Sequence, residues 1–261
     1  MRRMARIWIL AACLTSSFGA TALADGGERG ADSSDFAARL ERAQKSESRP
    51  EADKARDANR LPAATLAFFG IESDMRVLEL VPGGGWYTRL LAPALDGTGQ
   101  LYLAFGTERL PEGFLESPEM KNVRVIAKQS GLVPTDRRGV FEVPAFEFEV
   151  QDLDAVLTFR NLHNLTPTAR ANLNRAVFDA LRSGGIYGVI DHTRRHMQPD
   201  EGWNQRRLDP VLVIEEIQAA GFVLEDASPL HRRPKDALDK EVGDPSVTGQ
   251  TDRFTLKFRK P

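Results

Sequence analysis

The stretch of sequence that decides the fold is VLELVPGGGWY, residues 77–87. Four apolar residues surround Glu79, which is typical of a strand buried in a parallel sheet. Three glycines follow Pro82, and apolar residues then recur at helical spacing up to residue 95, so we expect a helix that includes Pro93. A strand, a glycine turn and a helix together bring backbone N–H groups close to a nucleotide-like ligand. A tight turn without a ligand would have the same sequence.

Strand and helix signals alternate along the rest of the chain. Apolar runs predict further strands at 100–105, 123–126, 153–159, 186–191, 222–226 and 253–258. Spacing and capping residues predict helices at 34–48, 60–70, 166–182 and 209–221. Residues 140–150 partly alternate and could add a strand or hairpin, but Pro144 interrupts them. The alternation of strands and helices predicts an α/β fold whose mainly parallel sheet is covered on both faces.

The first 24 residues have the features of a bacterial export signal. Three arginines precede a mainly apolar run at 7–20, and Ala-Leu-Ala at 22–24 fits a cleavage site. The run is too short to span a membrane, so we expect a periplasmic or secreted chain that begins at Asp25. A lipoprotein box that ends at Cys13 is the alternative, but its apolar run is very short. We therefore divide the chain into a signal peptide (1–24), a flexible leader with a helical segment (25–59) and one domain (60–261).

Composition excludes disulfide and thiol chemistry and argues against the binding of nucleic acid. Cys13 is the only cysteine, so the cleaved chain has neither a disulfide nor a thiol nucleophile. Cleavage removes three arginines and no acidic residue, which moves the formal net charge from −2 to −5. An acidic chain is a poor general binder of nucleic acid, so we expect no nucleic-acid partner.

The glycine turn carries a family resemblance. Counted from Glu79, the sequence reads acid-x-Val-x-Gly-Gly-Gly. This resembles motif I of the class I, Rossmann-like methyltransferases that depend on S-adenosylmethionine, an acid followed by x-Gly-x-Gly-x-Gly. Gly83 and Gly85 match the second and third glycines, and Val81 replaces the first. The resemblance implies that Glu79 approaches the methionine end of the cofactor and that the backbone of Gly83, Gly84 and Gly85 passes beneath it.

Three further signals resemble this family in the expected order. DLDAVL at 152–157 resembles its fourth strand, LRSGGI at 181–186 the turn before the fifth, and AAGF at 219–222 the turn before the sixth. The similarity covers about residues 60–260, and it implies a three-layer Rossmann-like sandwich with seven strands, the last antiparallel. The segments that resemble a group of exported bacterial predicted methyltransferases are 57–87, 158–164 and 191–192.

Candidate site residues lie where three of the predicted strands end, because sites in open α/β sheets form beyond the carboxyl ends of the strands. His163 and His192 are candidate catalytic bases, since imidazole titrates near neutrality. Asp191 could orient a histidine or bind substrate. Their structural alternatives are a satisfied loop histidine for His163 and a helix cap or surface pair for Asp191 and His192.

Four residues are candidates for contact with the methyl acceptor, an unidentified group that we expect to be a small molecule: Trp86, Tyr87, Arg160 and Asn161. Arg160 could hold an anionic substrate or pair with Glu79 or Asp154. Trp86 could form a wall over the ligand or pack in the core.

The chain also departs from the family pattern. The ribose is usually held by an acid at the end of the second strand, but residues 103–106 contain none, and Glu108 is the nearest candidate. His192 and His196 would face one side of a helix, but no third ligand is evident, so we expect no metal site. The basic residues of 194–195 and 231–233 are typical of solvated loops. The alternative to an enzyme is a binding protein that kept the fold and lost the chemistry.

Overall fold

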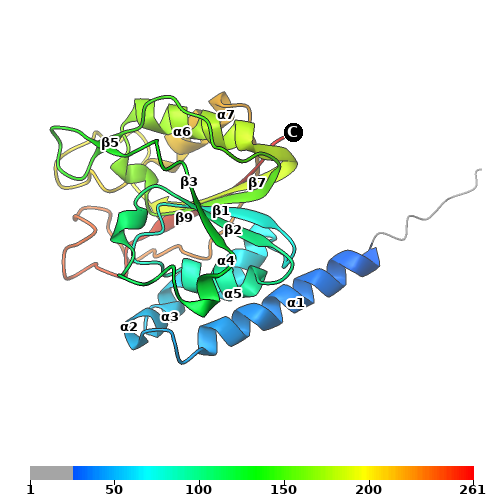
Figure 1. Ribbon diagram of the computed structural model, residues 1–261. Helices are drawn as coiled ribbons and strands as arrows, with labels where there is room; N and C mark the ends of the chain where they lie inside the picture. The colour runs from blue at the N-terminus through cyan, green and yellow to red at the C-terminus, as the bar shows by residue number, and fades with distance from the viewer. Residues whose placement is uncertain (1–25) are drawn as a thin grey trace, which may run out of the picture.

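A seven-stranded sheet forms the centre of the molecule (Figure 1). The computed structural model describes residues 26–261. The order of the strands is β3-β2-β1-β6-β7-β9-β8. All pairings from β3 to β7 are parallel, and β9 is antiparallel to both β7 and β8. The predicted α/β sandwich with an antiparallel last strand is therefore confirmed. Its strands are β1 Arg76–Leu80, β2 Gln100–Ala104, β3 Val123–Ile126, β6 Leu153–Phe159, β7 Leu181–His192, β8 Val223–Ala227 and β9 Arg253–Arg259.

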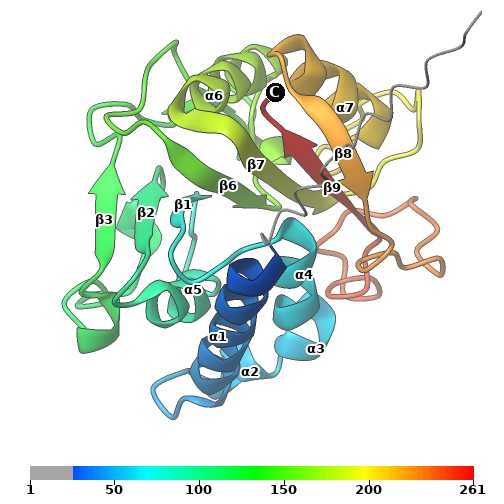
Figure 2. The same cartoon turned by 90° about the vertical axis from the view of Figure 1, so that its right-hand side faces the viewer.

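Helices cover both faces of the sheet (Figure 2). The residue pattern of β1 shows why both faces are covered. Successive side chains of a strand point to opposite faces of the sheet, and the neighbours Val77 and Leu78 are both fully buried, each in a different apolar core. One face is covered by α1 Gly26–Lys45, α2 Glu51–Lys54, α3 Asp57–Arg60, α4 Pro62–Phe69 and α5 Thr88–Leu95. The other is covered by α6 Pro167–Ala180 and α7 Pro210–Ala219.

The predicted capping residues are confirmed. The Thr166 side chain accepts a hydrogen bond from the Ala169 N–H at the start of α6, and Asp209 accepts one from Val211 at the start of α7. Gly70 ends α4 in the left-handed conformation, with φ 72°. These local signals fix where the helices begin and end.

Two local predictions were only partly right. Residues 146–150 form no strand, and only β5 Phe141–Glu142 pairs, with β4 Val133–Pro134. The rings of Phe146 and Phe148 pack against Phe105 instead, because apolar contact with the sheet outweighs the alternating pattern. The turn expected at 181–186 is part of β7, but the register with β6 is interrupted between Leu181 and Ile186, and Gly184 there has a φ of 76°.

Three short 3₁₀ helices complete the fold: η1 Thr107–Arg109, η2 Pro118–Met120 and η3 Leu162–Asn164. Within residues 26–261 no helix is both long and apolar enough to cross a lipid bilayer. The export signal expected at 1–24, with Cys13, lies outside the described residues.

Candidate functional site

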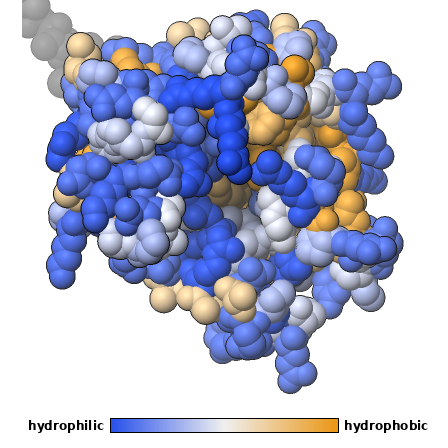
Figure 3. Space-filling view, turned by 90° about the vertical axis from the view of Figure 1, so that its left-hand side faces the viewer, coloured by the Kyte–Doolittle hydropathy of each residue, from blue (hydrophilic) through white to orange (hydrophobic). Residues whose placement is uncertain are grey.

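A cavity of about 700 Å³ opens beyond the carboxyl ends of β1, β6 and β7. Its walls include the glycine turn after β1, the loop after β6 and the end of β7, which are the segments that the sequence placed together. Figure 3 shows this face of the molecule, with a hollow near its middle rimmed mainly by hydrophilic residues. The predicted site residues that line the cavity are Glu79, Val81, Gly83, Gly84, Trp86, Tyr87, Arg160, Asn161, His163 and His192.

The glycine turn is open at two of its three glycines. A Cβ added to Gly83 or Gly84 would meet no atom within 4 Å, so the backbone there borders free space. A Cβ on Gly85 would lie 2.4 Å from the ring of Phe114, so this glycine is needed for packing rather than for access. The open part of the turn is therefore Gly83 and Gly84.

Glu79 is buried beneath the turn and is 2% exposed. Its Oε2 accepts a hydrogen bond of 2.7 Å from the Thr88 hydroxyl at the start of α5. Burial raises the pKa of Glu79 to about 7, although the Thr88 hydrogen bond and the positive charge of Arg60 oppose this shift. The carboxyl group is thus close to half protonated at neutral pH and responds to any charge placed in the cavity.

Trp86 and Tyr87 both line the cavity and pack in the core. The Trp86 indole N–H donates to the Asp53 carbonyl, and its ring contacts that of Tyr87 edge-on at 4.6 Å. Tyr87 stacks on Phe159 with ring centroids 3.6 Å apart. Both side chains are under 5% exposed. They form one wall of the cavity and leave its space free.

Asp191 organises both candidate histidines. Its carboxylate lies 2.6 Å from Nδ1 of His163, and it also accepts the backbone N–H groups of His163 and His192. Asp191 itself is fully buried and does not line the cavity. Nδ1 of His192 lies 2.9 Å from the Thr251 hydroxyl. Burial, and then the neighbouring His163, hold the pKa of His192 well below its usual range, so His192 is neutral at pH 7.

Asn161 and Arg160 have different roles from each other. The Asn161 amide donates to the carbonyls of Leu80 and Val81, which ties the loop after β6 to the glycine turn. Among the described residues Arg160 forms no ion pair with Glu79, and Asp154 pairs with Arg182 instead. The guanidinium of Arg160 therefore remains available to the cavity that it lines.

The sequence did not reveal the basic rim of the cavity or its N-terminal wall. Arg109 ends η1, Arg138 and Arg206 come from two separate loops, and Arg56 and Arg60 come from the segment before α4. Isolated arginines in polar segments give no distinctive signal. They make the cavity strongly cationic, because Asp53 and Glu79 are the carboxylates among its described lining residues.

One predicted contact lies elsewhere. Glu108 is exposed on η1 and is not a lining residue of the cavity. Beside it, Phe105 directly follows β2, and its ring lies 5.2 Å from Phe146 and 6.2 Å from Phe148. The end of β2 is thus covered by aromatic rings, and no carboxylate faces the cavity from there.

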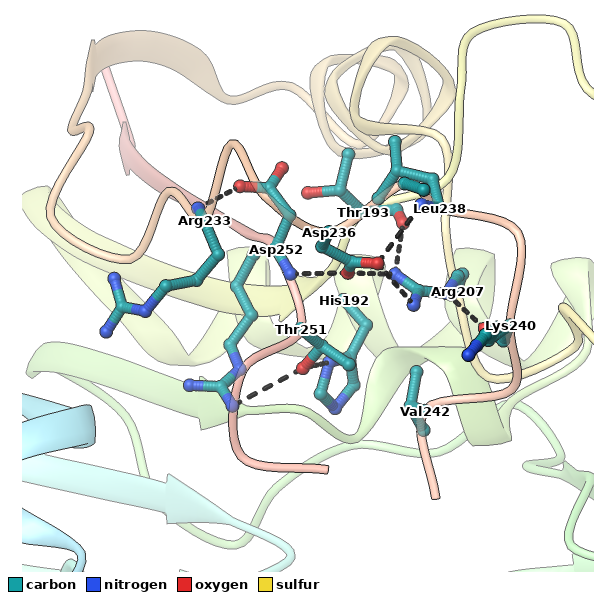
Figure 4. Close-up of polar contacts among 12 residues, drawn as sticks. His192, Thr193, Arg207, Arg233, Asp236, Leu238, Lys240, Val242, Thr251 and Asp252 are labelled. Atoms are coloured by element: carbon teal, nitrogen blue, oxygen red, sulfur yellow. Dashed lines mark hydrogen bonds and ion pairs between the residues drawn. The ribbon is translucent and has the colours of Figure 1, made fainter. Parts of the chain in front are cut away.

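The segment 228–252 is a loop, and a buried ion pair fixes it over the site. Arg207 reaches Asp236 at 2.9 Å, and the N–H groups of Asp252 and Leu238 donate to the same carboxylate (Figure 4). His231, which was expected among solvated charges, is instead 2% exposed and contacts the carbonyl of Arg60. This loop therefore also holds the N-terminal wall.

The described residues contain no cluster of three or more His, Cys, Asp or Glu side chains that could hold a metal ion. Residues 193–196 are not helical, so the spacing of His192 and His196 does not place them on one face. His196 is exposed and lies 2.9 Å from Asp209.

Solved structures with the same fold include methyltransferases. The [4+2]-cyclase SpnF has a TM-score of 0.53 at 16% identity, covering 89% of this chain and 96% of its own. A proposed sarcosine dimethylglycine methyltransferase from Galdieria sulphuraria has a TM-score of 0.52 at 13% identity, covering 81% and 88%. An S-adenosylmethionine-dependent methyltransferase from Aquifex aeolicus has a TM-score of 0.47 at 16% identity, covering 80% and 96%.

The two likenesses with TM-scores above 0.5 show a methyltransferase-like Rossmann fold, and the cyclase shows that this fold serves other reactions. No family model matches the chain, and no curated protein does.

Proposed function

We propose that this protein is an S-adenosylmethionine-dependent methyltransferase that acts on a small acceptor. The observation that carries the proposal is the open backbone of Gly83 and Gly84, which shares one cavity with Glu79 and His163. The likeness in fold to the proposed sarcosine dimethylglycine methyltransferase, with a TM-score of 0.52, supports it.

The lining residues fit the amino-acid end of the cofactor. Gly83 and Gly84 allow close approach of a ligand to the backbone, and Glu79 offers a buried carboxyl group to an ammonium group. When bound, S-adenosylmethionine would supply an activated methyl group. No carboxylate faces the cavity from the end of β2, so the ribose contact of the usual family pattern is not reproduced by Glu108.

His163 is the residue suited to take a proton from the acceptor. The buried Asp191 engages its Nδ1, which orients the ring and leaves Nε2 as the nitrogen available to a ligand. An acidic partner also stabilises the imidazolium that forms. His192 is held neutral and is bound to Thr251, so it lines the cavity in a supporting position.

Titration calorimetry with S-adenosylmethionine tests the proposal, using a variant that fills the open turn. Gly84 has no left-handed φ and no neighbour within 4 Å, so Gly84→Leu should fold and block the cavity floor. We expect it to weaken cofactor binding at least tenfold. Gly131→Leu is the matched control, since Gly131 has equally open surroundings but does not line the cavity. No heat with the native chain at millimolar cofactor, or unchanged binding by Gly84→Leu, would count against the proposal.

A binding protein without transfer activity is the second candidate. The observation that favours it is the aromatic cover at the end of β2, formed by Phe105, Phe146 and Phe148. A binding protein should retain some other ligand on purification and show no affinity for S-adenosylmethionine. Native mass spectrometry of the chain from its own host separates the two functions.

Export also belongs to this proposal. The proposed signal ends with cleavage after Ala24, so a mature chain that starts elsewhere than Asp25, as read from the mass of the exported protein, would contradict this cleavage site.

A further inference from the structure

Three arginines meet at the inner end of the cavity. Arg60 is the last residue of α3, Arg160 directly follows β6, and Arg253 is the first residue of β9, where it pairs with His192 of β7. A second cavity of about 10 Å³ is lined by all three arginines. Arg60 and Arg160 also line the large cavity, so the two spaces are neighbours.

None of these three guanidinium groups forms an ion pair with a carboxylate of the described residues. Arg253 is 4% exposed; its Nε is buried without a hydrogen-bond partner, and its Nη2 has only a long contact of 3.4 Å to Thr251. The guanidinium of Arg60 lies 4.4 Å from the centre of the Trp86 ring. Arg60 and Arg253 are buried, and buried cations without a carboxylate partner are costly, so an anion would stabilise this cluster.

The nearby carboxylates are engaged elsewhere. Asp191 attracts Arg160 and Arg253 electrostatically, but its oxygens bind His163 and the backbone N–H of His192. Asp252, the neighbour of Arg253, pairs with Arg232 and accepts the N–H of Arg233. The positive charge of the cluster is thus not neutralised by hydrogen-bonded partners within the described chain.

The electrostatics agree with this geometry. Burial, and then repulsion from Arg160, lower the pKa of Arg60 to about 8 and that of Arg253 to about 10. Burial, followed by repulsion from Arg56, also lowers the pKa of Arg160. A bound anion would reverse these shifts.

We propose that Arg60, Arg160 and Arg253 form an oxyanion-binding site, and that the acceptor therefore carries a carboxylate or phosphate group. The assignment of the anionic group to the acceptor rests on the proposed function. The existence of the anion site does not. A space of about 10 Å³ holds roughly one water-sized group, so one oxygen of the anion would enter it while the rest of the ligand occupies the large cavity. Guanidinium groups suit this task because they donate several hydrogen bonds to such oxygens.

Inorganic phosphate and acetate are the probes, titrated into the full chain at constant ionic strength set with sodium chloride. We expect at least one of them to bind saturably and to raise the thermal midpoint of unfolding. Binding of phosphate assigns a phosphate-bearing ligand, and binding of acetate alone assigns a carboxylate.

Two variants and a control locate the site. Arg253→Met and Arg160→Met should each weaken the probe at least tenfold. In the absence of the probe, Arg253→Met should melt no lower than the native chain, because it removes a buried, unpaired charge. Arg109→Met removes the same charge from the exposed rim of the same cavity and should bind the probe as the native chain does.

The inference is overturned if neither probe binds, if the Arg253 and Arg160 variants both bind like the native chain, or if Arg109→Met loses as much affinity as they do. Competition between phosphate and S-adenosylmethionine would overturn the assignment to the acceptor, since the arginines would then hold the carboxylate of the cofactor. Probe binding without any affinity for S-adenosylmethionine would refute the proposed function and leave the anion site standing.

Discussion

At the scale of single residues, the site depends on a few buried polar groups whose neighbours set their properties. Asp191 receives three hydrogen bonds and orients His163, while Thr88 supplies one hydrogen bond to Glu79. The sequence identified Glu79, Asp191 and His163 because they follow or belong to predicted strands. It could not identify Thr88 as the partner of Glu79, because nothing in a helix start distinguishes a hydroxyl that faces a buried acid.

Glu79 gives a prediction about pH. Its pKa of about 7 means that roughly half of the molecules carry a proton there at pH 7. A positively charged ligand group beside the carboxyl lowers that pKa, so binding of S-adenosylmethionine at pH 7 should release roughly half a proton. The release should shrink at pH 8.5, where Glu79 is already ionised, and should vanish in Glu79→Gln.

Calorimetry in two buffers with different ionisation enthalpies measures this release. Thr98→Val, which changes a hydroxyl bonded to the Ser73 carbonyl away from the cavity, serves as a control and should leave it unchanged. Proton uptake on binding, or equal release by Glu79→Gln, would show that Glu79 does not meet a cation.

At the scale of elements, the chain turns sharply as it leaves each of four parallel strands. The residue directly after each strand has a positive φ: Val81 at 51°, Phe105 at 63°, Ala127 at 55° and Arg160 at 64°. None of the four is glycine, so each turn holds a side chain in a conformation that costs energy. The strands and helices were predicted well because burial and capping are local, whereas these turns were not, since their residues favour other conformations.

Val81 is the most strained of the four residues, because a branched side chain is strongly disfavoured at positive φ. In an ordinary strand or helix, Gly is about 1 kcal/mol less stable than Ala. At position 81 we expect the reverse, with Val81→Gly more stable than Val81→Ala by about 1 kcal/mol, because only glycine is unstrained there.

Chemical denaturation of the two variants measures the difference. The control is the same pair of substitutions at Val77, a buried position in β1. There we expect Val77→Ala to be more stable than Val77→Gly. If the Ala variant were more stable than the Gly variant at position 81 as well, the turn would not be strained.

At the scale of the whole molecule, the site is assembled from segments that are distant in sequence. The loop at 228–252, which covers the site, is held in place by the ion pair between Arg207 and Asp236, whose side chains are both fully buried. The same loop contacts the carbonyl of Arg60 through His231. The contact between His231 and the Arg60 carbonyl joins the carboxyl-terminal part of the chain to the N-terminal wall of the cavity.

Loss of the Arg207–Asp236 ion pair should lower the free energy of unfolding. Asp236→Ala leaves Arg207 as an uncompensated buried charge, so we expect a loss of about 3–5 kcal/mol in the free energy of unfolding and faster proteolysis within 228–252. Glu241→Ala, which breaks the partly exposed pair with the adjacent Arg206, should cost about 1 kcal/mol or less. Equal losses for the two variants in denaturation and limited proteolysis would contradict this account of the loop.

The sequence by itself determined the order of strands and helices, the glycine turn at the end of β1 and the placing of His163, Asp191 and His192 at one edge of the sheet. These follow from apolar periodicity and from the rule that parallel strands end together. Only the tertiary structure decided that Glu108 lies outside the cavity, that aromatic rings cover the end of β2, and that Arg60, Arg160 and Arg253 converge. The physical reason is that a strand or helix is set by residues a few positions apart, whereas a charge cluster depends on where remote segments pack.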